Sequence, residues 1–192
     1  MIVKTDVVIL SSIKYGDSSR ILRVYSRDYG KISIIIKGAI SSKNRYGSAI
    51  EPLSISEIQF YFKKNTDLYL VSSAETKVNL KNVRNNLDRI AIGMMILESI
   101  SQSHEEKDKN EMLFDEIVSS LEILNTIEFS PVIALIYFEI KHSLNLGFDI
   151  NFNFLDLNRS DLNNEILYFS LFDTSIAKNF DIIKGKSIKL NG

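Results

Sequence analysis

The period of the hydrophobic residues changes from two to 3.6 near Lys81, and this change restricts the possible folds more than any other feature. Before it, glycine turns such as Asp28-Tyr29-Gly30 separate short segments with strand-like patterns. The segments are Val3–Ile13, Arg20–Ser26, Lys31–Lys37, Leu53–Phe62 and Leu68–Val78. Five short strands with this punctuation are typical of a small closed β-barrel.

After Lys81 the apolar spacing predicts three helices. The apolar face of the first is Val83, Leu87, Ile90, Ala91, Met94, Leu97 and Ile100, and that of the second is Met112, Phe114, Ile117, Val118, Leu121 and Leu124. Ser130 as N-cap, Pro131 at the first position and Gly147 as C-terminal stop delimit the third. The charged segment 104–110 between the first two helices is expected to be a solvated loop.

These patterns predict an α+β protein with two domains. Residues 1–80 form a five-stranded barrel, and residues 81–192 form a helical domain that ends in a small irregular or β segment. Within that last segment, Ile166–Phe172 and Ile182–Leu190 are candidate paired strands.

The basic residues are concentrated in the predicted barrel. Residues 14–45 contain eight Lys or Arg and two acids, Asp17 and Asp28. Residues 1–80 contain 12 Lys and Arg against 7 Asp and Glu, a net charge of +5, whereas residues 81–192 contain 11 against 17, a net of −6. Clustered basic residues on a folded element indicate a phosphate-backbone partner.

Eight residues are therefore candidate nucleic-acid contacts: Lys14, Arg20, Arg27, Lys31, Lys37, Lys43, Arg45 and Tyr46. Lys and Arg replace counterions on phosphates, and aromatic rings stack on the bases of single strands. Tyr15, Tyr25 and Tyr29 also lie among the basic residues, but packing in the barrel core is an equally good reading of each tyrosine. The loop 41–46 is the leading candidate for direct contact; its alternative is a mobile solubilising loop.

Catalysis has no support in the sequence. The chain has no cysteine, which excludes disulfides, thiolate metal sites and cysteine nucleophiles. Its two histidines, His104 and His142, lack zinc-ligand spacing, and neither a phosphate-binding loop nor a nucleophile elbow occurs. His142 is expected to be a helix-surface or satisfied buried residue. We expect a protein that is no enzyme and uses no cofactor or metal.

No signal peptide or membrane-spanning run is visible, which predicts a cytoplasmic protein without membrane contact.

A series of short motifs resembles the N-terminal domain of a bacterial recombination mediator family, RecO. In chain order they are Tyr15-Gly16-Asp17-Ser18-Ser19, Ile21-Leu22, Gly30-Lys31, Lys37-Gly38-Ala39, the basic loop 41–45, Glu51-Pro52-Leu53 and Ser73-Ala74-Glu75. Further on, Phe138-Glu139-Ile140-Lys141 and the segment 144–148 resemble the family's helix that ends in Leu-Gly-Tyr. The resemblance covers residues 1–150.

The resemblance implies an OB-fold barrel followed by a helical domain. It also implies binding of single- and double-stranded DNA, annealing of complementary strands, and assistance to RecA loading together with RecR and single-stranded-DNA-binding protein. We expect a monomer. Many family members carry a four-cysteine zinc site after the Leu-Gly-Tyr helix, and this chain has no cysteine to form one. The alternatives are an OB-fold adaptor that binds an acidic protein, and an RNA-binding protein without a role in DNA repair.

Overall fold

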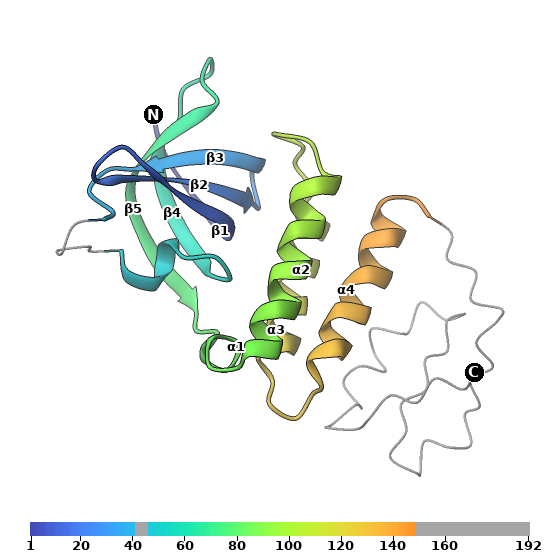
Figure 1. The fold of residues 1–192 in the computed structure, drawn as a ribbon. Coiled ribbons are helices and arrows are strands. Elements are labelled where there is room, and N and C mark those ends of the chain that lie inside the picture. Colours follow the sequence, from blue (N-terminus) through green and yellow to red (C-terminus); the bar gives the residue numbers. More distant parts are fainter. Residues whose placement is uncertain (41–45, 149–192) are drawn as a thin grey trace, which may run out of the picture.

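The computed structural model of this chain describes residues 1–40 and 46–148. It contains a β-barrel with the helices packed on one side of it (Figure 1). The predicted strands at 166–172 and 182–190, and the candidate contacts Lys43 and Arg45, lie outside the described residues.

The five predicted strands are confirmed, and they close into a barrel. They are β1 (Ile2–Tyr15), β2 (Ser19–Ser26), β3 (Gly30–Ile36), β4 (Ile55–Tyr61) and β5 (Leu68–Val78). The strand order is β1-β2-β3-β5-β4, with β4 returning to β1. Every pairing is antiparallel except β3 with β5. This five-stranded closed barrel is an OB-fold.

The strand β1 is apolar on both of its faces where the helices cover it. Val7 and Ile9 point into the barrel, whereas Val8 and Leu10 belong to the core shared with the helices. Successive residues of a strand point to opposite faces, so the continuous apolar run in this part of β1 reflects burial on both sides.

The fourth strand begins later than its sequence predicted. The segment Leu53–Phe62 was expected to be extended, but Leu53 has a φ of 60° and β4 begins at Ile55. The Leu53 side chain is 4% exposed and lies in the core formed with the helices. Gly93 on the facing helix leaves the space for it, because a Cβ there would lie 2.6 Å from Leu53 Cδ2.

Four helices follow: α1 (Lys81–Arg84), α2 (Leu87–Ser103), α3 (Glu111–Asn125) and α4 (Pro131–Asn145). Asn86 and Asn110 cap α2 and α3, each accepting a bond from the backbone N–H three residues on. The third predicted helix is confirmed, with Pro131 at its start and Gly147 beyond its end at a φ of 82°.

The first predicted helix was wrong in its continuity and in part of its buried face. The chain leaves α1 at Asn85, and the cap at Asn86 starts α2 as a new helix. As a result Leu87 is 79% exposed and Met94 is 40% exposed, although both were expected to be buried. The buried residues of α2 are Arg89, Gly93, Ile96, Leu97 and Ile100.

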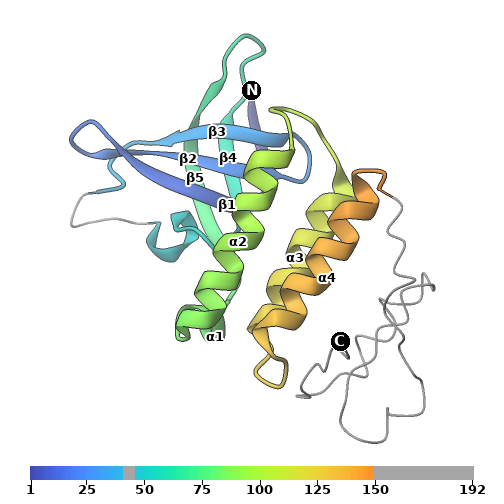
Figure 2. The same cartoon turned by 45° about the vertical axis from the view of Figure 1, so that its right-hand side comes forward.

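One hydrophobic core joins the barrel to the helices. Val8, Leu10, Tyr25, Leu53 and Ile55 of the barrel belong to the same buried cluster as residues of all four helices. Figures 1 and 2 both place α2 between the barrel and α4. A second cluster fills the barrel interior. No helix in the described part of the chain is both long and apolar enough to cross a bilayer.

Candidate nucleic-acid interface

Three basic residues of β2, the β2–β3 turn and β3 contact the part of the chain that follows the barrel: Arg23, Arg27 and Lys31. Arg23 forms an ion pair with Glu106, and Arg27 forms one with Asp115 while its guanidinium lies 5.3 Å from the ring centre of Phe114. These charges are therefore compensated within the molecule. Arg27 was a candidate DNA contact; in the structure its partner is the carboxylate of Asp115.

Lys31 is buried and bonded to backbone carbonyls, so it is not exposed for contact with a phosphate. The residue is 5% exposed, and its ammonium donates to the carbonyl oxygen of Ser101 at 2.8 Å and to that of His104. Its own carbonyl accepts the backbone N–H of Lys107 at 2.8 Å. Lys31 thus satisfies carbonyls at the C-terminal end of α2, where four lack helical partners. We therefore correct its assignment: Lys31, proposed from the sequence as a DNA contact, connects the barrel to the C-terminal end of α2.

The segment 104–110, expected to be a solvated loop, is mostly exposed but attached to the barrel. Lys107 pairs with Asp67 of the β4–β5 loop at 2.6 Å, and the backbone of Glu106 bridges to Lys31. The hydroxyl of Tyr25 donates to the carbonyl oxygen of Asp108 at 3.4 Å. Burial raises the pKa of Tyr25 to about 12, with the charge of Asp108 adding to the effect.

The structure also removes Tyr46 as a stacking platform. Tyr46 is 8% exposed and packs in the barrel core, so its ring offers no open face to a base. Tyr25 is fully buried. Both tyrosines therefore pack in a hydrophobic core and do not serve as stacking residues. Tyr15, at the last position of β1, is 54% exposed. Sequence patterns gave no means of separating these three tyrosines.

Arg20 is paired within the barrel. Its guanidinium donates to Glu51 at 2.8 Å and to the Ser12 hydroxyl at 3.2 Å. The guanidinium keeps part of its surface exposed, with a side-chain accessibility of 30%. Arg20 is therefore a secondary candidate, since a phosphate would compete with Glu51 for it.

Lys14 and Lys37 are the candidates that remain open. Both are exposed, and no described acidic side chain forms an ion pair with either. Lys14 pairs with Arg20, and Arg20 pairs with Ile36, which directly precedes Lys37. Both lysines thus lie at the same end of the strands, beside the β1–β2 turn. Figures 1 and 2 place this turn on the side of the barrel away from the helices.

Two further lysines, Lys63 and Lys64, were missed by the sequence analysis. They lie in the β4–β5 loop, are exposed, and have no ion pair among the described residues. The turn residues Asn65-Thr66-Asp67 next to them were a usable signal, because loops at barrel ends commonly contact ligands.

The two histidines lie next to each other, His104 partly buried and His142 buried. Their ring centres are 5.1 Å apart, and His142 is 5% exposed with its Nε2 at 2.9 Å from the Ser103 hydroxyl. Burial lowers the pKa of both imidazoles. His142 is buried, as one of the two expectations had it, but it is only half satisfied, because its Nδ1 is buried without a hydrogen-bond partner. Within residues 1–40 and 46–148 no three potential metal-binding side chains gather.

The comparison with known families agrees with this architecture. The family models for the N-terminal and C-terminal parts of recombination protein O match residues 1–79 and 84–166. A protein of Chlorobium limicola named DNA repair protein RecO is 32% identical over 149 residues, which are 78% of this chain and 57% of that protein. One of the same name from Pelodictyon phaeoclathratiforme is 34% identical over 150 residues, 77% of this chain and 57% of that protein.

A third relative, DNA repair protein RecO of Salinibacter ruber, is 31% identical over 127 residues, 66% of this chain and 49% of the relative. The chain thus spans about half the length of the curated relatives that it matches.

The molecule is an OB-fold protein whose barrel shares its core with a helical bundle and keeps open lysines at the end of the barrel away from that bundle. Both parts match the two models of one family in the correct order. The chain belongs to the RecO family of recombination proteins.

One prediction separates the structural lysine from the open ones. Replacing Lys31 with Met keeps the apolar stem but leaves two carbonyls without their donor, which should lower the free energy of unfolding by about 1–3 kcal/mol. Lys37→Met should leave it unchanged. Urea unfolding followed by circular dichroism measures both. Unchanged stability in Lys31→Met would show that its carbonyl contacts contribute nothing.

Proposed function

We propose that this chain is a recombination mediator in DNA repair that binds DNA through Lys14 and Lys37 at the end of the barrel, together with the sequence-predicted contacts Lys43 and Arg45. The observation that supports it most directly is a pair of exposed lysines on an OB-fold, on the side away from the helices, with no ion-pair partner within residues 1–40 and 46–148. Family membership supports the role in recombinational repair.

The binding mechanism is neutralisation of the phosphate backbone. Lysine and arginine side chains displace condensed counterions, so the affinity falls as salt rises, and the contact reads no base sequence. Lys43 and Arg45 would add two further positive charges for phosphate contact. If two strands are neutralised at once, their mutual repulsion falls and complementary strands anneal faster.

The charge contact is tested by fluorescence anisotropy of labelled DNA across a salt series. Lys14→Glu with Lys37→Glu should weaken binding at least tenfold at low salt and flatten the salt dependence by about 0.7 per lost contact on single strands. Lys81→Glu is the control, because it makes the same kind of charge change at an exposed lysine of α1, in the helical part.

If Lys81→Glu lowers the DNA affinity as much as the Lys14→Glu with Lys37→Glu variant does, binding depends on the overall charge of the protein and not on a site at the barrel end. RNA of the same length tests the RNA-binding alternative. Absent binding to both nucleic acids at low salt would leave the adaptor alternative. Annealing of complementary strands no faster than in the protein-free reaction would remove strand annealing from the proposal.

The proposal includes two partners that the family implies, RecR and single-stranded-DNA-binding protein. It also includes the activity that they support, the loading of RecA. Co-sedimentation of the full chain with purified RecR, and with single-stranded-DNA-binding protein, tests the two contacts. No complex with either at micromolar concentration would restrict the proposed function to DNA binding.

A further inference from the structure

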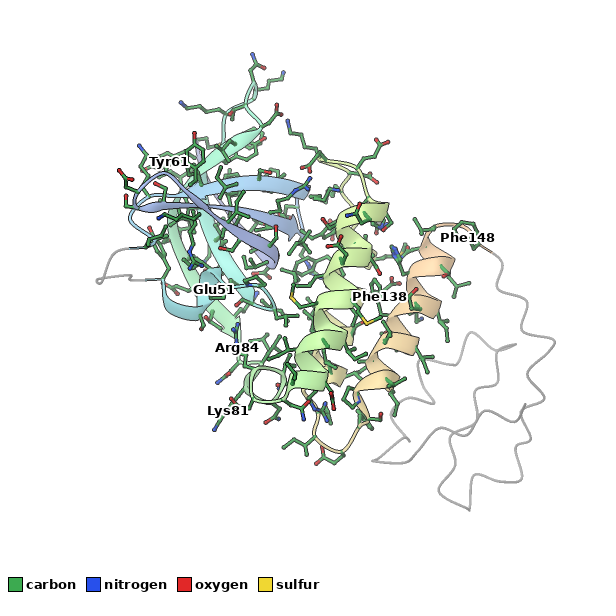
Figure 3. The ribbon with its side chains drawn as sticks, viewed as in Figure 1. Glu51, Tyr61, Lys81, Arg84, Phe138 and Phe148 are labelled. Carbon is green, nitrogen blue, oxygen red and sulfur yellow. The ribbon has the colours of Figure 1, made fainter. Side chains whose placement is uncertain are left out.

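The outward face of β2 beside the β2–β3 turn is covered by the part of the chain that follows the barrel. Tyr25, which points outward there, is fully buried in the core shared with the helices. The segment 104–110 lies beside β3, where the backbone of Glu106 bridges to Lys31 (Figures 1 and 3). In OB-folds the face of the second and third strands commonly binds oligonucleotides. One end of that face is therefore occupied by the chain itself.

Two arginines lie at the border of this covered area. Arg23 lies two residues before Tyr25 on the same face of β2, and Arg27 directly follows the strand. Unlike Tyr25, both arginines keep exposed side-chain surface, 46% for Arg23 and 36% for Arg27. Each forms an ion pair with a carboxylate from outside the barrel, Glu106 for Arg23 and Asp115 for Arg27. We call Glu106 and Asp115 the carboxylate pair.

The two ion pairs have the chemistry of an arginine–phosphate contact and are open to exchange. Carboxylate and phosphate oxygens both accept charge-assisted hydrogen bonds from a guanidinium. Exposed ion pairs contribute little to stability, and the carboxylates are themselves exposed, 45% for Glu106 and 58% for Asp115. The buried Nε of Arg27 has no hydrogen-bond partner among the described residues. A phosphate that reaches this face thus meets arginines that are occupied by exchangeable carboxylates.

We propose that the carboxylate pair is an internal competitor of DNA, which lowers the DNA affinity of the barrel by occupying Arg23 and Arg27. The inference rests on the proposed function and adds an autoinhibitory contact between the basic and the acidic parts of the chain. The net charges of +5 for residues 1–80 and −6 for residues 81–192 favour such a contact. Lys14 and Lys37 form no ion pair within the described part of the chain, so they stay available to DNA.

The test is the DNA affinity of Glu106→Gln with Asp115→Asn, which we call the carboxylate variant. It is measured on the full chain by fluorescence anisotropy with a labelled oligothymidylate of about 16 nucleotides. Both substitutions keep the size of the side chain and remove its charge. We expect binding at low salt to tighten at least about fivefold, and the salt dependence to steepen by about 0.7 for each freed arginine.

The matched control is Glu105→Gln with Glu122→Gln. It removes two exposed carboxylates from the same loop and from α3, and neither forms an ion pair with a described residue. The net charge changes as much as in the carboxylate variant, but no arginine of the barrel is freed. The DNA affinity of the control should therefore change less than about twofold.

The arginines provide a second measurement. Arg23→Gln with Arg27→Gln, added to the carboxylate variant, should remove the gain in affinity, because no freed guanidinium remains. In the wild-type chain the same arginine substitutions should weaken binding less, since the carboxylates already occupy both side chains. Urea unfolding of each variant checks that folded proteins are compared. Where the carboxylate variant is unstable, Glu106→Gln and Asp115→Asn are measured singly, and each should tighten binding.

The results distinguish this inference from the proposed function. An equal gain in the control variant would show a general effect of net charge and overturn the inference. A gain that persists after both arginines are replaced would overturn it too. If the carboxylate variant binds as the wild type does, while Lys14→Glu with Lys37→Glu weakens binding, the inference falls and the proposed function stands. If neither the wild-type chain nor the carboxylate variant binds DNA at low salt, both fall together.

Discussion

Gly30→Ala should destabilise the protein by about 3–5 kcal/mol, a loss large enough to be diagnostic for a single methyl group. Gly30 has a φ of 65°, a region that costs other residues about 1–2 kcal/mol. A Cβ at this position would also overlap the carbonyl group of Asp108 in the 104–110 loop. Because backbone atoms form the obstacle, the loop itself must move, and its contact with Lys31 would be lost.

Gly16→Ala is the matched control for this prediction. Gly16 has a φ of 60°, but a Cβ there would meet no atom within 4 Å. Its cost should be the backbone term alone, about 1–2 kcal/mol. Urea unfolding of both variants measures the difference. Equal losses in Gly30→Ala and Gly16→Ala would show that the loop yields freely and that its attachment to the barrel is weak.

Arg89→Met is expected to cost about 3–5 kcal/mol, since the removed guanidinium serves four backbone carbonyls. Arg89 is 7% exposed, and it donates to the carbonyl oxygens of Leu124, Thr126, Ile127 and Phe129 at the connection between α3 and α4. Burial lowers the pKa of Arg89, and the charge of Glu128 opposes that shift. Of the four carbonyls left behind, that of Thr126 keeps one donor, the backbone N–H of Phe129 at 3.3 Å.

Arg89→Lys tests the geometry of this contact apart from its charge. A lysine ammonium is a compact point charge and cannot reach carbonyls on both sides of the α3–α4 connection as a planar guanidinium does. About half of the stability lost in Arg89→Met should therefore remain lost in Arg89→Lys. Thermal unfolding gives the comparison. Full recovery in Arg89→Lys would mean that the positive charge alone holds the connection.

The strands were predictable because their signals are local. Alternating apolar residues and glycines at turns depend on neighbours in sequence, and the five segments agree with the barrel to within a few residues. Leu53 shows the limit of that approach. Its apolar side chain fits a strand pattern, yet the residue adopts a positive φ because its side chain fills space beside Gly93.

The candidate site was only partly predictable, because a charge count does not contain the partner of each charge. Lys31 is the second residue of strand β3 and Lys37 directly follows that strand, and nothing in their sequence neighbourhood separates them. The structure does so through Ser101 and His104, which are about seventy residues away in sequence and accept bonds from Lys31. The same applies to Arg27 and Asp115. Leu87 was misplaced for a local reason, the unrecognised cap at Asn86.

The core shared by the barrel and the helices means that the change of period near Lys81 does not mark a place where the molecule can be divided. A barrel cut after Val78 would turn Val8, Leu10, Tyr25, Leu53 and Ile55 toward water, all of them at most 4% exposed in the intact molecule. Such a fragment would expose an apolar surface on the side that the helices cover in the intact molecule. The helices α1 to α4 thus cover one apolar side of the barrel. The end of the barrel that carries Lys14 and Lys37 remains exposed, because the helices pack on the other side.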